Sequence, residues 1–141
     1  MNSTTYADVL GAHDVEIPAH LVADAEVPVV TGMQRQGDII VIPATPGADT
    51  GTIVPAAGIA VVRGENGGNT HLLVGDLADP NAITWRPTRG GDQMELGTVT
   101  VPAGRVAHLI HPEHGAQGIG EGTYRIRRQR EQADEIRMVA D

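Results

Sequence analysis

Three histidines and a glutamate near the end of the chain are of the types that could do chemistry. His108, His111, Glu113 and His114 all lie in the segment His-Leu-Ile-His-Pro-Glu-His-Gly. Neutral imidazoles beside a carboxylate are what a metal ion or an acid–base step requires. A set of two histidines and one carboxylate suits Zn, Ni, Mn or Fe(II).

The predicted secondary structure decides which of these side chains can meet. His108 and His111 are three residues apart around a predicted strand over residues 105–110, so their side chains project to opposite faces. A proline then breaks the strand and leaves the later residues at the mouth of a loop, which His71 can approach from a neighbouring strand. The predicted metal site is therefore His71, His111, Glu113 and His114. The alternative is that these histidines are solvated or cap the backbone.

A stripe of arginines follows in Gly-Thr-Tyr-Arg-Ile-Arg-Arg-Gln-Arg-Glu, and its members are Arg125, Arg127, Arg128 and Arg130. The first two share one face of a predicted strand, whereas Arg128 and Arg130 lie where the strand leaves the core and are expected to pair with acids. The stripe suits either a solvated face paired with acids at 131, 134 and 135 or an acidic neighbouring subunit. Nucleic acid is a weaker alternative, because aromatic residues for base stacking are missing.

The chain lacks the residues that other common catalytic mechanisms require. The chain has no cysteine and no lysine, and Ser3 is its only serine, so thiolate, Schiff-base and Ser-His-Asp mechanisms are not supported. The glycine-rich segment 64–68 lacks the lysine of a phosphate-binding loop. An enzyme is therefore less favoured than a binding or structural protein, and a cofactor other than a divalent transition metal (Zn, Ni, Mn or Fe) is not expected.

Composition describes the domain that must position these groups. The chain has 141 residues, 18 glycines, 9 prolines, no phenylalanine and a net charge of −8. An acidic protein of this kind disfavours nucleic acid and anionic membranes as partners. We find no secretory signal pattern and no apolar run of membrane-spanning length, so the expectation is a protein that stays in the cytoplasm or is assembled there into a larger particle.

Short apolar runs separated by Gly/Pro turns predict a mainly β protein. The expected fold is an antiparallel β-barrel or sandwich of about 8–10 short strands. Residues 1–32 are predicted to be an extended arm or edge strands, and residues 33–141 the barrel or sandwich domain. Residues 111–122 are predicted to be a Gly-rich loop, and residues 133–140 a short C-terminal helix.

Several motifs resemble those of an uncharacterised family of small bacterial and phage-associated β-proteins. The matching segments are Gln36-Gly-Asp-Ile-Ile-Val-Ile, Gly64-Glu-Asn-Gly-Gly-Asn-Thr-His71, Glu113-His-Gly and Gly122-Thr-Tyr-Arg-Ile-Arg-Arg-Gln-Arg-Glu. The family pattern has a second histidine in the turn, where this chain has Asn69. The resemblance covers about residues 33–141. Because the activity of that family is unknown, it implies a fold and assigns no function.

Two functional hypotheses follow from these observations. The first is a non-enzymatic structural or interaction module that forms a homo-oligomer or part of a larger assembly, with phage decoration as one version. The second is a small, cupin-like metal-binding β-barrel that uses the loop histidines.

Overall fold

The computed structural model describes residues 4–62, 70–89 and 94–129. Within these ranges the chain forms one α-helix and eleven β-strands. The elements are α1 (Tyr6–Ala12), β1 (Val29–Val30), β2 (Gln34–Gln36), β3 (Ile39–Pro43), β4 (Thr52–Ile53), β5 (Ile59–Val62), β6 (His71–Val74), β7 (Thr84–Pro87), β8 (Glu95–Val101), β9 (Ala107–His111), β10 (Gly115–Ile119) and β11 (Gly122–Arg128).

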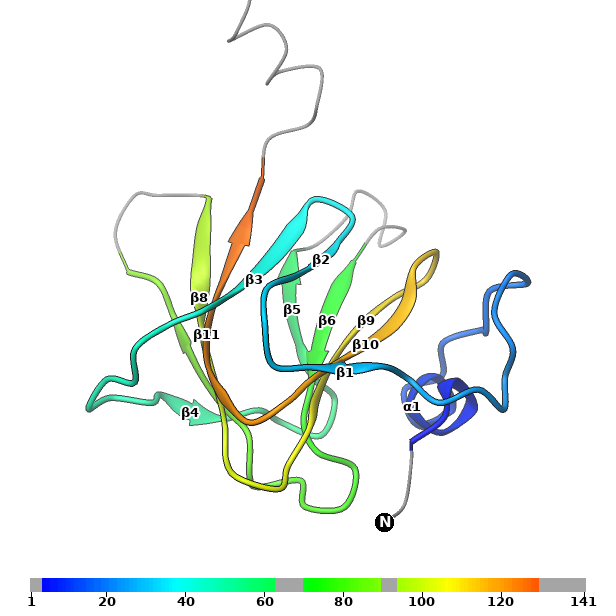
Figure 1. Cartoon of the computed structure of the whole chain (residues 1–141), viewed down its shortest axis with the longest axis horizontal. Coiled ribbons are helices and arrows are strands. Elements are labelled where there is room, and N and C mark those ends of the chain that lie inside the picture. Colours follow the sequence, from blue (N-terminus) through cyan, green and yellow to red (C-terminus); the bar gives the residue numbers. More distant parts are fainter. Residues whose placement is uncertain (1–3, 63–69, 90–93, 130–141) are drawn as a thin grey trace, which may run out of the picture.

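The strands form two sheets that face each other (Figure 1). One sheet has five strands in the order β1-β10-β9-β6-β5, and the other has six in the order β2-β3-β11-β8-β7-β4. All pairings are antiparallel except the one between β1 and β10, which is parallel. The mainly β prediction is therefore confirmed. The described strands form no closed barrel, and the expected count was too low because β2 and β10 were not predicted as strands.

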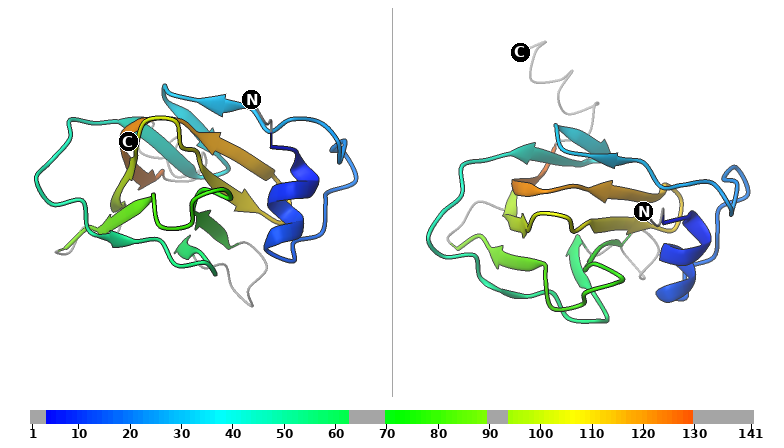
Figure 2. Two further views of the ribbon diagram at one scale, coloured as in Figure 1. Left: turned by 90° about the horizontal axis from the view of Figure 1, so that it is seen from below. Right: turned by 60° about the horizontal axis from the view of Figure 1, so that its bottom comes forward.

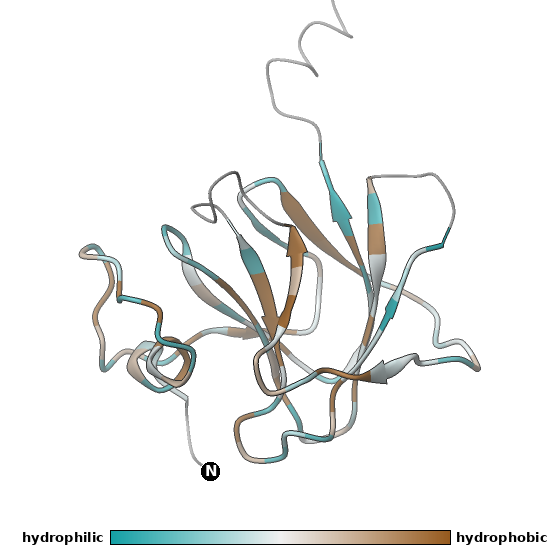
Figure 3. Ribbon diagram, turned by 180° about the vertical axis from the view of Figure 1, so that it is seen from behind, coloured by the Kyte–Doolittle hydropathy of each residue, from teal (hydrophilic) through white to brown (hydrophobic). Residues whose placement is uncertain are grey.

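Aliphatic side chains fill the space between the two sheets, and hydrophobic residues dominate the middle of the strands (Figure 3). In β8, for example, the alternate residues Val99 and Val101 are buried in this core. Trp85 and Tyr124 are the aromatic members. The buried Tyr124 hydroxyl donates to the carbonyl of Gly120 at 2.9 Å, which avoids an unsatisfied polar group in the core.

The N-terminal segment contains a helix that the predicted extended arm does not include. Thr5 caps α1, because its hydroxyl accepts a hydrogen bond from the Asp8 N–H while the Asp8 carboxylate accepts one from the Thr5 N–H. The helix buries Val9 and Leu10 in a second apolar cluster with Val74 of β6, Ile110 of β9 and Ala116 of β10. Figure 2 shows α1 beside β9 and β10. The segment thus covers the outer face of its own five-stranded sheet.

The Gly-rich loop predicted over residues 111–122 is wrong, because residues 115–119 form β10. Glycine in this strand permits close approach of another backbone. A Cβ on Gly118 would lie 2.8 Å from Val29 Cγ2 and 3.0 Å from the Pro28 carbonyl oxygen. The glycines that suggested a loop are therefore what lets β1 pair alongside β10.

The strand predicted over residues 105–110 corresponds to β9 and agrees with it to within two residues at each end. The C-terminal helix predicted over residues 133–140 lies outside the described residues, as does Arg130. Among the described elements, no helix has the length and apolar character needed to cross a bilayer.

Candidate functional site

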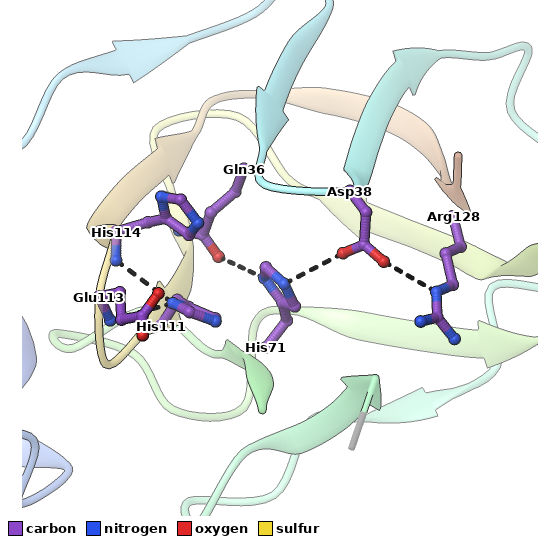
Figure 4. Close-up of polar contacts among 7 residues, drawn as sticks. All are labelled: Gln36, Asp38, His71, His111, Glu113, His114 and Arg128. Atoms are coloured by element: carbon purple, nitrogen blue, oxygen red, sulfur yellow. Dashed lines mark hydrogen bonds and ion pairs between the residues drawn. The ribbon is translucent and has the colours of Figure 1, made fainter. Parts of the chain in front are cut away.

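Five polar residues meet where several strands end at one edge of the two sheets. Three come from the five-stranded sheet and its β9–β10 turn: His71 begins β6, His111 ends β9, and His114 lies in the turn. Gln36 ends β2 and Asp38 lies in the β2–β3 turn. We call these five residues the rim site. Figure 4 shows their side chains directed toward one another, and Figure 3 shows hydrophilic residues at the upper ends of β6 and β11.

The three histidine rings of the rim site are in contact. The ring centroids of His71 and His111 are 4.3 Å apart, and those of His111 and His114 are 4.6 Å apart. The His71 and His114 centroids are separated by 6.4 Å. The structure therefore brings together all three histidines of the predicted metal site.

Glu113, the predicted carboxylate ligand, does not join this cluster. Its side chain is exposed, and within the described residues its carboxylate makes no hydrogen bond or ion pair. The Glu113 backbone N–H instead donates to His111 Nδ1 at 3.0 Å. The carboxylate that lies against the histidines belongs to Asp38, whose Oδ1 is 3.4 Å from His71 Nε2.

Gln36 determines which nitrogen of His71 carries the proton. The buried Gln36 side chain donates from Nε2 to the carbonyl of Leu109 at 2.9 Å. Because that carbonyl can only accept, the amide oxygen must face the other way, and it lies 2.9 Å from His71 Nδ1. His71 Nδ1 is therefore assigned as the donor, and a neutral His71 has its lone pair on Nε2.

The lone pair on His71 Nε2 faces the carboxylate of Asp38. These two electron-rich groups need a positive charge between or beside them. Protonation of His71 would supply one, but burial first and the neighbouring His111 second lower the pKa of His71 to about 4, against the raising effect of Asp38. The ring is therefore mostly neutral at pH 7. Asp38 Oδ2 is balanced on its other side by Arg128, whose Nε donates to it at 2.8 Å.

His111 has the opposite tautomer. Its Nδ1 accepts the backbone N–H groups of Glu113 and His114 at 3.0 and 3.2 Å, so a neutral ring carries its proton on Nε2. Burial and the nearby His114 lower the pKa of His111. The ring therefore holds the β9–β10 turn in place and presents an N–H donor. In this form it has no free lone pair for a metal.

His108 lies on the opposite face of β9, as strand alternation predicted. Its side chain is buried on the face of the five-stranded sheet that α1 covers. Neither ring nitrogen has a hydrogen-bond partner within the described residues. Burial lowers its pKa to about 4, against the raising effect of Asp76. His108 is therefore excluded from the rim site.

Most of the arginine stripe forms ion pairs, as expected, but with acids far away in the sequence. Arg125 donates from Nε and Nη2 to both oxygens of Glu95 at 2.8 and 3.0 Å, and Arg127 Nε lies 2.8 Å from the same carboxylate. This pairing raises the pKa of Arg125. Arg128 pairs with Asp38 on the other side of the strand. The predicted acidic partners at 131, 134 and 135 lie outside the described residues.

Sequence reasoning missed Gln36 and Asp38 as members of the site. Both flank Gly37, which has φ of 59° in the two-residue hairpin turn between β2 and β3. A Cβ on Gly37 would lie 3.1 Å from His114 Nε2 and 3.4 Å from His71 Cε1. The sequence feature that could have identified them is the Gln-Gly-Asp motif itself. Its two polar side chains lie on either side of a glycine, and the missing Cβ of that glycine lets the histidines approach.

The fold and the site define a two-sheet β domain with a histidine and carboxylate cluster at one edge of its core. Residues 35–129 match a family described as a domain of unknown function (DUF8820), and the chain belongs to this family. The match includes every residue of the rim site and excludes α1 and β1. No curated protein and no solved structure matches the chain. The expected membership of an uncharacterised family is confirmed, whereas a bacterial or phage association stays a prediction.

Proposed function

We propose that this protein is a β-sandwich that binds a divalent transition metal at the rim site. His71 Nε2, the Asp38 carboxylate and His114 are the ligands. The observation that carries the proposal is the 3.4 Å approach of a neutral imidazole nitrogen to a carboxylate oxygen, with Gln36 fixing the tautomer. A cation that both groups ligate resolves the repulsion between their lone pairs.

The hydrogen bond from His71 Nδ1 to Gln36 supports this assignment. Histidines that bind metals commonly donate their second ring nitrogen to a carbonyl or carboxylate, which fixes the ring and makes it a better ligand. Arg128 plays the corresponding part for Asp38 by holding one carboxylate oxygen and leaving the other directed at His71.

The third ligand requires a movement of His114. Within residues 4–62, 70–89 and 94–129, no three His, Asp or Glu side chains are placed closely enough to hold an ion. His114 is an exposed turn residue, so rotation about its side-chain bonds costs little, and its ring already lies against Gly37. Two histidines and one carboxylate with open positions suit Fe(II), Mn, Ni or Zn.

Calorimetric titration of tag-free protein with ZnCl2, NiCl2 and MnCl2 tests the proposal. We expect saturable uptake of a single ion per chain, and an affinity at least about tenfold lower for Asp38→Asn and His114→Ala. Glu113→Gln is the matched control, because it removes a carboxylate from the same turn that is not part of the rim site. Far-UV circular dichroism checks that each variant is folded.

Three outcomes contradict the proposed metal site or its ligands. Absence of saturable binding with all three ions excludes it. Equal affinity of Asp38→Asn and the parent shows that the carboxylate is not a ligand. Loss of binding in Glu113→Gln but not in Asp38→Asn would restore the ligand set expected from the sequence.

Self-association is a second proposed function, favoured by the distribution of exposed apolar side chains. Of the five large hydrophobic residues that are exposed in the described part of the chain, Val22, Val29 and Met33 lie within residues 22–33. The strands β1 and β2 in this region are the edges of the two sheets, and exposed edges pair readily with other chains. We propose that a second copy, or the surface of a larger particle such as a phage, covers this region.

Native mass spectrometry of the full chain tests self-association. Deletion of residues 1–30 is unsuitable, because it would remove α1 and uncover Ile110 and Ala116. Val29→Asp and Met33→Glu are expected to convert a discrete oligomer to monomer. A wild-type protein that is monomeric at high concentration rules out self-association.

A further inference from the structure

The outer face of the six-stranded sheet carries a second group of polar residues, away from the rim site. Strand pairing aligns Arg86 of β7, Thr98 of β8 and Arg125 of β11 in one row. The next row aligns Thr84, Thr100 and Thr123 on the same three strands. Side chains on one face of aligned strands are neighbours, so two arginines lie on either side of a threonine, above a row of hydroxyls.

A loop turns this face into a cleft. Residues 44–51 leave the end of β3 and project beside the sheet (Figure 1). The cleft between them has a volume of about 410 Å³, which is in the range of small-molecule sites. We call it the outer-face cleft, and the polar residues that line it and carry the argument are Asp49, Arg86, Thr98, Thr100, Thr123 and Arg125.

The base of the loop is fixed against the sheet. Gly51 has φ of 85°, and a Cβ there would overlap the carbonyl of Trp85. The Gly51 N–H donates to Asp49 Oδ1 at 2.9 Å, which holds the aspartate in its turn. The side chains of the cleft are therefore attached to strands or to a turn whose backbone is constrained.

The charges of the cleft favour an anion. Glu95 holds the Arg125 guanidinium by Nε and Nη2, which leaves the two N–H groups of Nη1 and one of Nη2 available. Arg86 is exposed and makes no ion pair within the described residues. Arg86, Arg125 and Arg127 supply three positive charges at the cleft, and Glu95 and Asp49 supply two negative charges. The cleft therefore has a local charge of +1, although the whole chain has a net charge of −8.

The spacing of the arginines suits a single tetrahedral oxyanion. Adjacent strands are about 4.8 Å apart, so the backbones of Arg86 and Arg125 are separated by roughly 10 Å across β8. Both long side chains can reach an anion placed over Thr98, and guanidinium groups pair with phosphate oxygens by two parallel hydrogen bonds. The threonine hydroxyls can donate to or accept from ligand hydroxyls, and the second oxygen of Asp49 can accept from them.

We propose that the outer-face cleft binds a small phosphorylated compound that also carries hydroxyl groups, such as a sugar phosphate. Arg86 and Arg125 hold the phosphate over Thr98, and Thr100, Thr123 and Asp49 contact the hydroxyls. This site is independent of metal binding at the rim site.

Calorimetric titration at low ionic strength with glucose 6-phosphate, inorganic phosphate and glucose tests the assignment. We expect saturable binding of glucose 6-phosphate, competition by inorganic phosphate, and much weaker binding of glucose. Arg86→Gln is expected to lower the affinity for glucose 6-phosphate by about tenfold or more. Arg105→Gln is the matched control, because Arg105 is paired with Asp76 and Asp79 elsewhere on the surface.

Each other result overturns the proposal. If Arg86→Gln binds glucose 6-phosphate as tightly as the parent, Arg86 and Arg125 do not hold the phosphate together. An equal loss in Arg105→Gln shows that the binding is a general charge effect. Equal affinities for glucose and glucose 6-phosphate show that the cleft does not recognise the phosphate group. If none of the three probes binds, the cleft is not a site for small phosphorylated compounds.

Discussion

The buried, unpartnered imidazole of His108 should make the stability of the protein fall in mild acid. Its exposed fraction is 2%, and no group in the described residues hydrogen bonds to either ring nitrogen. Asp76 favours the protonated ring and His13 opposes it, but burial outweighs both and lowers the pKa from 6.5 to about 4. Because the unfolded chain then binds the proton more tightly than the folded chain, protonation favours unfolding.

The size of the effect follows from the two pKa values. The stabilisation is fully present above pH 6.5, decreases as the pH falls, and is lost by pH 4. The complete difference corresponds to about 3 kcal/mol in the free energy of unfolding. Between pH 7 and pH 5 the same relation gives a loss of about 2 kcal/mol.

Urea denaturation of His108→Leu at pH 7 and at pH 5 measures this contribution. Leucine has a similar volume and no polar atoms, so we expect a stability at pH 7 within about 1 kcal/mol of the parent. The fall in stability from pH 7 to pH 5 should be about 2 kcal/mol smaller in the variant than in the parent. His71, whose pKa is also lowered to about 4, contributes equally to both proteins and cancels in the comparison.

His20→Leu, at an exposed position, is the control and should retain the pH dependence of the parent. If His108→Leu loses as much stability as the parent between pH 7 and pH 5, the reasoning from burial is refuted.

Two further predictions concern glycines. Gly37→Ala and Gly104→Ala should each destabilise the fold by about 1–2 kcal/mol in urea denaturation, because both glycines have positive φ. Only Gly37→Ala should also weaken metal binding, since its Cβ would displace the His114 ring; equal metal affinities in the two variants would contradict the assignment of His114. Gly97→Ala should cost about 3 kcal/mol, because its Cβ would lie 2.6 Å from Cη2 of the buried Trp85. Trp85 is the only tryptophan, so its fluorescence follows the same unfolding transition, and an unchanged midpoint would show that the ring can move aside.

The regular strands were predictable because their side chains alternate. In β8, Val99 and Val101 face the core, while Thr98 and Thr100 face outward. By contrast, β10 was missed because its glycines carry no hydrophobic pattern, and their role depends on a strand almost ninety residues earlier in the sequence. The helix α1 is seven residues long, and only the Thr5 and Asp8 capping box marks it.

The histidines of the rim site were predictable from residue type and from strand parity. The carboxylate was not, because Glu113 is adjacent to the histidines in sequence whereas Asp38 is adjacent to them only in the folded chain. Gln36 acts through a hydrogen bond to a residue 35 positions away and another to a residue 73 positions away. Contacts of this kind are set by how the two sheets face each other, which local pattern does not specify.

The pairing of β1 with β10 gives the N-terminal segment the role of a tethered ligand. Its strand extends the edge of a sheet as peptides do in β-strand addition, and α1 covers the adjoining apolar face. Both elements lie outside residues 35–129, the part of the chain that matches the family. The N-terminal segment therefore extends the five-stranded sheet in cis, and its attachment to the same chain raises its local concentration at that edge.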